Sequence, residues 1–230
     1  MARKDRVPNP PKRPQAPQRR STPSGPRDAD RQRRLLYIVA ATGLIGLAII
    51  LGVFFLAGGD DEDIAATMQE AGCQLREVPA QAGDHTAELD ATSNPKWNTD
   101  PPTSGPHYQV PAVWGVYTDP VNQAQLVHNL EHGGVAIQYG SDVPAATVQQ
   151  LKAFAQDHPR GTVVAPYPSL GDQIALGAWV TESASEPEKG TAYLAKCPAF
   201  DEAAFAAFLD AYQFRGPERF PPDTLLPGRT

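Results

Sequence analysis

A run of 23 residues without a charged side chain, residues 35–57, constrains this chain more than any other feature of its sequence. As an α-helix the run would be about 34 Å long, enough to cross the roughly 30 Å hydrocarbon core of a bilayer. Three arginines closely precede it (Arg31, Arg33 and Arg34), and four acidic residues at positions 60–63 follow it. The sequence therefore predicts one membrane-spanning helix.

The charges on either side of this run predict its orientation. Residues 1–34 carry eleven Lys and Arg against three Asp and Glu, whereas the rest of the chain carries nine against 23. Basic segments stay cytoplasmic, so we expect a single-pass plasma-membrane protein with its N-terminus inside and its C-terminal domain outside. The bilayer is then a partner through residues 35–57, while the net charge of −14 after residue 34 disfavours nucleic acid.

Two alternatives exist for the same run. A cleaved signal peptide ending near Ala57-Gly58-Gly59 has the right position, but the apolar part of such peptides is about 7–15 residues long. The buried helix of a soluble protein is the other alternative. Both fit the length and the flanking charges less well than a membrane anchor.

The remaining segments differ in composition. Residues 1–34 contain seven prolines and few large apolar side chains, which predicts a disordered cytoplasmic tail. After the span we expect a juxtamembrane segment (58–72), one extracytoplasmic domain (73–215) and a Pro-rich C-terminal tail (216–230).

Hydrophobic periodicity predicts an α+β fold for the outer domain. Residues 79–120 show little periodicity, and loops of this length in compact domains are often functional. The core is predicted as β-α-β-β-α over residues 135–212, preceded by this long loop region. The expected elements are helices at 60–70, 122–132, 144–157 and 201–212, and strands at 73–78, 135–139, 162–167 and 173–180.

Cys73 and Cys197 are the two cysteines of the chain, and both follow the predicted span. An even pair in an oxidising compartment predicts a disulfide. Such a bridge would close a loop of more than a hundred residues, worth about 4–5 kcal/mol in the chain-entropy model. Two buried thiols or two metal ligands are the alternatives.

The five histidines carry the candidate chemistry. His132 follows His128 by four positions, so the two share a face of a helix and could chelate one ion. His107 lies in the rigid Thr-Ser-Gly-Pro-His-Tyr turn at 103–108 and could add a third imidazole nitrogen. Such a site suits Zn²⁺ or Cu²⁺. Alternatively, these imidazoles are structural and donate hydrogen bonds to backbone carbonyls.

A catalytic function is not favoured by the motifs. His128-x-x-Glu131-His132 matches the inverted zincin pattern, in which the glutamate activates a zinc-bound water. However, Gly133 and Gly134 follow at once, and those enzymes need a stable helix to hold the ligands. The chain has no Walker loop, dinucleotide fingerprint or nucleophile elbow, and two methionines are too few for a Met-rich Cu(I) carrier. The sequence leaves enzymatic activity undecided and points away from it.

Three strings resemble the hallmark sequences of a known family: TDPPTSGPHY (99–108), LVHNLEHGGVAIQY (126–139) and KCPAF (196–200). This family consists of bacterial membrane-anchored proteins, common in high-GC Gram-positive bacteria, that share a domain of unknown function. The resemblance covers roughly residues 70–215. It implies the same membrane topology, but no activity.

The resemblance also implies a recurrent set of polar residues that includes His85 and Glu131 beside the three histidines above. We therefore expect a metal site of His107, His128 and His132 with His85 as the fourth ligand, and with Glu131 and Tyr108 around the ligands. His158, at the predicted end of a helix before Pro159, is expected to be structural. The competing functions are a non-catalytic interaction domain of the cell envelope and a metal-dependent hydrolase, and protein partners are not indicated.

Overall fold

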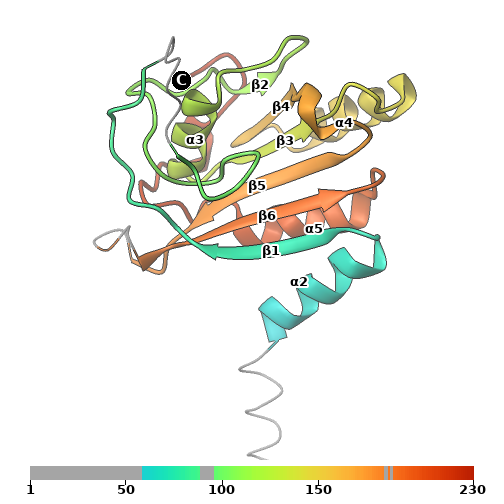
Figure 1. Cartoon of the computed structure of the whole chain (residues 1–230), viewed down its shortest axis with the longest axis horizontal. Coiled ribbons are helices and arrows are strands. Elements are labelled where there is room, and N and C mark those ends of the chain that lie inside the picture. Colours follow the sequence, from blue (N-terminus) through green and yellow to red (C-terminus); the bar gives the residue numbers. More distant parts are fainter. Residues whose placement is uncertain (1–58, 89–95, 184–185, 187–188) are drawn as a thin grey trace, which may run out of the picture. The chain divides into compact units, whose positions relative to one another are not determined.

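One mixed sheet forms the centre of the fold (Figure 1). In the described part of the chain it has six strands in the order β1-β6-β5-β3-β4-β2. The strands β2, β4 and β3 are parallel to one another, while β5 and β6 continue the sheet in antiparallel pairs and β1 closes the other edge. Their bounds are β1 Gln74–Pro79, β2 Gly115–Val116, β3 Val135–Tyr139, β4 Thr162–Pro166, β5 Ile174–Val180 and β6 Thr191–Cys197.

The computed structural model describes residues 59–88, 96–183, 186 and 189–230. The predicted cytoplasmic tail (1–34) and membrane span (35–57) lie outside these residues. Within the described ranges, none of the helices combines the length and the apolar character needed to cross a bilayer.

Four α-helices of the described chain pack on the two faces of the sheet. They are α2 Gly59–Glu70, α3 Gln123–Glu131, α4 Ala145–Asp157 and α5 Glu202–Tyr212, with short 3-10 turns at Pro168–Leu170 and Pro222–Thr224. The large hydrophobic core joins α2, α4 and α5 to one face, and a smaller cluster joins α3 to the other. Successive side chains of a strand point to opposite faces of the sheet, and β3 contributes to both clusters for this reason. Val135 and Ile137 enter the large core, while Ala136 faces α3.

Local sequence fixes both ends of α3. The side chain of Asn122 accepts a hydrogen bond from the backbone N–H of Ala124 at 2.9 Å and so caps the first turn. At the other end Gly133 adopts a φ of +86°. A side chain there would be strained, and its Cβ would come within 2.9 Å of the Phe214 backbone. The helix therefore stops directly after the residues that carry the candidate chemistry.

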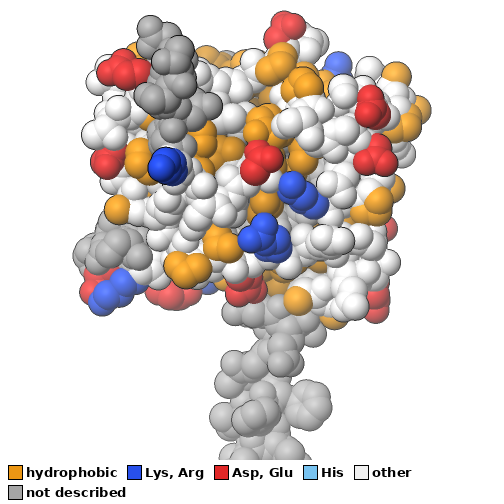
Figure 2. All heavy atoms as spheres, in the orientation of Figure 1, with side chains coloured by type: hydrophobic (Ala, Val, Ile, Leu, Met, Phe, Trp, Pro, Cys, Tyr) orange, Lys and Arg blue, Asp and Glu red, His pale blue; other side chains and the backbone are white. Residues whose placement is uncertain are grey.

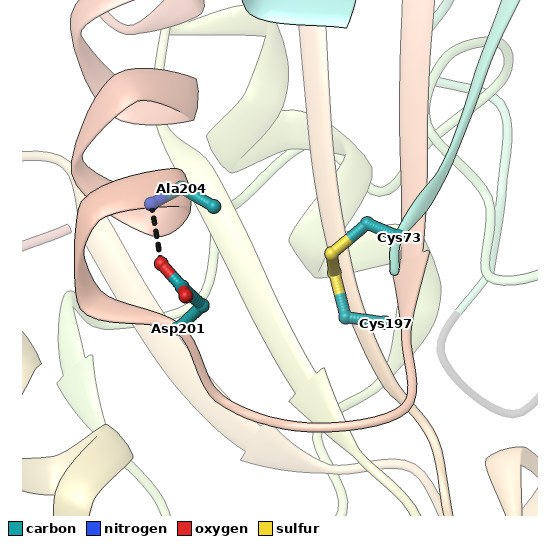
Figure 3. The surroundings of a disulfide bond; sticks show 4 residues. All are labelled: Cys73, Cys197, Asp201 and Ala204. Atoms are coloured by element: carbon teal, nitrogen blue, oxygen red, sulfur yellow. Dashed lines mark hydrogen bonds between the residues drawn. A yellow bond between two sulfur atoms is a disulfide. The ribbon is translucent and has the colours of Figure 1, made fainter. Parts of the chain in front are cut away.

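The disulfide between Cys73 and Cys197 confirms the sequence prediction (Figure 3). Both sulfur-bearing side chains are buried, and the two Cα atoms lie 4.1 Å apart. The reason is the register of β1 against β6, in which Gln74 pairs with Lys196, so the next residues outward are Cys73 and Cys197. A structural disulfide indicates that the domain is extracytoplasmic.

The predicted β-α-β-β-α core is wrong in one respect, because β6 follows β5 before α5 begins. This strand, Thr-Ala-Tyr-Leu-Ala-Lys-Cys, lies between β1 and β5 and is buried on both faces over most of its length. A strand covered on both faces shows no alternation of apolar and polar residues, so periodicity does not reveal it. The other predicted elements are present, and none of their ends is shifted by more than one residue.

Residues 216–230 pack against the domain. Leu225 is buried and its carbonyl accepts a hydrogen bond from the N–H of Gly161 at 2.7 Å. Further along, the carbonyl of Arg229 accepts from the N–H of Trp114 at 2.8 Å. This C-terminal segment therefore reaches the side of the sheet that carries α3.

On the surface shown in Figure 2, acidic and basic side chains are interspersed rather than gathered into a patch of one sign.

Candidate metal centre

Residues from four separate parts of the chain meet at the C-terminal end of α3. This helix supplies His128 and Glu131, and His132 is its C-terminal capping residue. His85 comes from the loop after β1 (residues 80–88, the first loop) and His107 from the loop before β2 (residues 96–114, the second loop). The sixth residue is Glu218, from the C-terminal segment. The long region of weak periodicity thus delivers two of the histidines.

Four of these side chains form an inner group: His85, His107, His128 and Glu131. One potential ligand atom from each lies within 4.8 Å of the others. Glu131 Oε2 is 2.9 Å from His107 Nε2 and 3.7 Å from His85 Nε2. Ligands of one tetrahedral zinc ion are about 3.2–3.5 Å apart, as follows from bond lengths of about 2.0–2.1 Å. The inner group therefore has the spacing needed to hold a metal ion.

An outer group shares His128 and adds His132 and Glu218. The Nε2 atoms of His128 and His132 are 3.0 Å apart, and Glu218 Oε2 is 3.4 Å from His132 Nε2. These separations are also close to those of ligands on one ion. The side chain of Glu218 is half exposed, so this group opens towards solvent.

Backbone carbonyls fix the tautomers of two imidazoles. His107 Nδ1 donates to the carbonyl of Gly105 at 2.8 Å, and His128 Nδ1 donates to that of Tyr108 at 2.7 Å. Because a carbonyl can only accept, each neutral ring carries its proton on Nδ1 and presents the lone pair of Nε2 to the cluster. This is how ligating histidines are usually oriented in metalloproteins.

Glu131 and His107 are buried together at the centre of the inner group. Their Oε2 and Nε2 atoms face each other at 2.9 Å, and among the described residues neither atom has another hydrogen-bond partner. Burial alone would lower the pKa of His107, but contact with Glu131 and the Gly105 carbonyl raises it above the ordinary value. Burial likewise favours neutral Glu131, but His107 and the neighbouring imidazoles lower its pKa. The contact thus favours a protonated His107 beside an ionised Glu131. The positive charge of His107 then lies where a metal cation would bind.

His128 and His132 are held neutral. Burial lowers the pKa of His128, and the neighbouring imidazoles of His107 and His85 lower it further. Burial and the neighbouring His128 lower the pKa of His132 to about 4. Both imidazoles therefore remain unprotonated at neutral pH, as a metal ligand must be.

The two loops are tied to each other beside this cluster. The N–H of His107 donates to the carbonyl of Asp84 at 2.8 Å, and that of Ala87 donates to the carbonyl of His107 at 3.2 Å. These bonds place His85 beside His107. The first loop also approaches the cluster closely, since a Cβ on Gly83 would lie 2.8 Å from both Glu131 Oε1 and the Trp179 ring.

The structure brings together His85, His107, His128 and His132, the four histidines that the sequence suggested as ligands. Glu131, expected around the ligands, lies among them instead. The backbone of Tyr108 lies beside the ligands, because its carbonyl accepts from His128. His158 is the C-cap of α4, where its ring packs 4.4 Å from that of Phe154.

Sequence reasoning missed Glu218. The residue lies in a Pro-rich segment without periodicity, and its distance from α3 along the chain gives no local signal. Its backbone N–H donates to the carbonyl of Glu131 at 2.9 Å, which brings the segment to the cluster.

Comparison with known proteins identifies the family of this chain. The model of a family described as "Protein of unknown function (DUF3105)" matches residues 89–223. The chain belongs to this family. The DUF3105 match contains five of the six clustered residues, from His107 to Glu218, while His85 and Cys73 precede it. No curated protein and no solved structure matches the chain.

Proposed function

We propose that this domain binds a divalent transition metal ion through its histidine and glutamate cluster. The observation that carries the proposal is the orientation of His107 and His128. Each ring is locked through Nδ1 onto a backbone carbonyl, which leaves Nε2 free to bind an ion. His107 Nε2 lies 2.9 Å from the buried Glu131 carboxylate, and His128 Nε2 lies 3.0 Å from His132 Nε2. Within the described residues, His107 Nε2 and Glu131 Oε2 have only each other as polar partners at hydrogen-bond distance, and a cation bound by both could replace the proton between them.

The donor set favours Zn²⁺ or Cu²⁺. Imidazole nitrogen suits both ions, whereas Mg²⁺ and Ca²⁺ prefer oxygen ligands. Soft donors are missing from the described part of the cluster, since both cysteines are in the disulfide and Met68 is buried in the large core. This argues against Cu(I), which thiolates and thioethers select.

We further propose that the cluster is held outside the cell by an anchor in the plasma membrane. The apolar run 35–57, the basic residues before it and the acidic residues after it support a single pass with the N-terminus in the cytoplasm. The disulfide fits this topology, because such bonds persist in oxidising compartments. A domain with a net charge of −14 after residue 34 is not expected to bind nucleic acid.

The alternative is a non-catalytic interaction domain in which these histidines only order the loops. One observation favours it: the bonds from His107 and His128 to Gly105 and Tyr108 tie the second loop in place without any ion. A hydrolase is less favoured, because α3 ends at Glu131 and leaves His132 as its capping residue. We therefore propose binding rather than catalysis.

Calorimetric titration of the chelator-stripped protein with Zn²⁺ and Cu²⁺ tests the proposal. We expect saturable binding and a rise in melting temperature, since an ion that binds only the native state stabilises it. Glu131→Gln and His107→Gln should each weaken binding at least tenfold, while His158→Gln, at the end of α4, serves as the matched control. If the protein binds neither ion, or if all three variants bind equally well, the proposal is wrong and the histidines have only a structural role.

A further inference from the structure

We propose that the centre holds two metal ions rather than one, a refinement that rests on the metal binding proposed above. The inner ion would be bound by His85, His107 and Glu131. The outer ion would be bound by His128, His132 and Glu218. Each ion then has three protein ligands.

The number and spacing of donors support two positions. A single tetrahedral ion takes four ligands, and the inner group already offers four, which leaves His132 and Glu218 without a role. Yet these two are as close to their neighbours as the inner donors are. Their contacts of 3.0 Å and 3.4 Å match the 2.9 Å and 3.7 Å contacts around Glu131.

His128 decides how the six donors divide. Its Nδ1 is bonded to the Tyr108 carbonyl, so it has one free nitrogen and can bind one ion. That nitrogen is 3.0 Å from His132 Nε2, so it is already close to the spacing of two ligands on one ion. With His128 on the outer ion, both ions have three protein ligands and open positions, which a water shared between them can fill. Paired ions in proteins lie about 3.5–4 Å apart.

The fold itself holds Glu218 at the outer position, through backbone and ring contacts of the C-terminal segment with α3 and its cap. Gly216 lies so close to α3 that a Cβ there would be 2.3 Å from the carbonyl of Glu131. Two residues later, the N–H of Glu218 donates to that same carbonyl. The Phe220 ring then packs 4.2 Å from the ring of His132. These contacts hold Glu218 and His132 together.

The charges around the centre are also suited to two ions. Glu131 and Glu218 supply two negative charges, and Asp84 adds a third close to His107. A shared hydroxide would supply a fourth, which balances two divalent cations. The outer ion requires His132 to carry its proton on Nδ1, so that Nε2 can bind.

The stoichiometry of zinc decides between one ion and two. The full-length protein is purified in detergent, stripped with chelator, loaded with Zn²⁺ and freed of unbound metal by gel filtration before metal analysis. We expect two zinc ions per chain for the wild type and one for Glu218→Gln and for His132→Gln. Asp223→Asn, an exposed acid in the same segment, should retain two.

A second measurement needs no variant. Two Cu²⁺ ions this close couple magnetically, so the electron paramagnetic resonance signal of the loaded wild type should be much weaker than its copper content predicts. One zinc per chain, an uncoupled signal that accounts for all bound copper, or two ions retained in both outer variants would each overturn the two-ion inference. One bound zinc would leave the proposed function intact, whereas none would overturn both.

Discussion

The metal-free domain should lose stability in acid because His132 is buried in its neutral form. Its pKa is lowered from 6.5 to about 4 by burial and by the neighbouring His128. As the pH falls below about 6.5, the unfolded chain takes up a proton at this residue and the folded chain does not. The free energy of unfolding therefore falls with pH until the folded imidazole is protonated as well, near pH 4.

The size of this effect follows from the two pKa values. Each pH unit between 6.5 and about 4 costs about 1.4 kcal/mol, so His132 accounts for about 3 kcal/mol. Glu131, whose pKa is lowered, adds a loss of the same sign as the pH falls through its folded pKa. His107 acts in the opposite direction, because its raised pKa gives stability that is present at low pH and lost as the pH rises. The total slope is therefore a sum of opposing contributions.

Comparison of the wild type with His132→Gln isolates the contribution of His132 to the pH dependence of stability. Urea unfolding is measured in chelator from about pH 7 to about pH 4 for the wild type and the variant. The difference in the free energy of unfolding between them should change by about 3 kcal/mol across this range, with the wild type losing more. If the difference stays constant within about 0.5 kcal/mol, the burial argument for His132 is wrong.

Three further outcomes are expected. Cys197→Ser opens a bridge between residues 124 apart in sequence, which should lower the free energy of unfolding in urea by about 5 kcal/mol; a loss below about 1 kcal/mol would contradict the entropic argument. Gly83→Ala would place a methyl group 2.8 Å from Glu131 and Trp179, so zinc affinity in calorimetric titration should fall roughly tenfold or more; unchanged affinity would mean that the first loop gives way freely. Protease added to intact protoplasts should digest the chain beyond residue 60 and spare residues 1–34, and protection of the outer domain would reverse the proposed orientation.

Local patterns in the sequence were enough to predict most helices and strands of the domain. The amphipathic pattern of α4 and the alternation in β3 depend on nearest neighbours, so they can be read without knowing the fold. The strand β6 could not be found this way, because its two covered faces remove the alternation. Its two alanines and its lysine also disfavour a strand assignment by composition.

The candidate site shows the same limit at the level of side chains. The spacing of His128 and His132 and the rigid turn around His107 predicted that these rings would converge, and they do. Whether they bind a metal stays a prediction. Glu218 could not be predicted, because its place depends on Gly216 packing against the end of α3, a contact between distant parts of the chain.

The position of the disulfide has a mechanical consequence if the chain is tethered at residues 35–57. Tension on such a tether would reach the domain through α2 and then pull on β1, which is an edge strand. An edge strand pulled from one end separates from its neighbour one residue pair at a time, which requires little force. The Cys73–Cys197 bond lies at the very end where that separation would start. The load would therefore pass into β6, inside the sheet, and the domain would resist being unravelled from its anchored side.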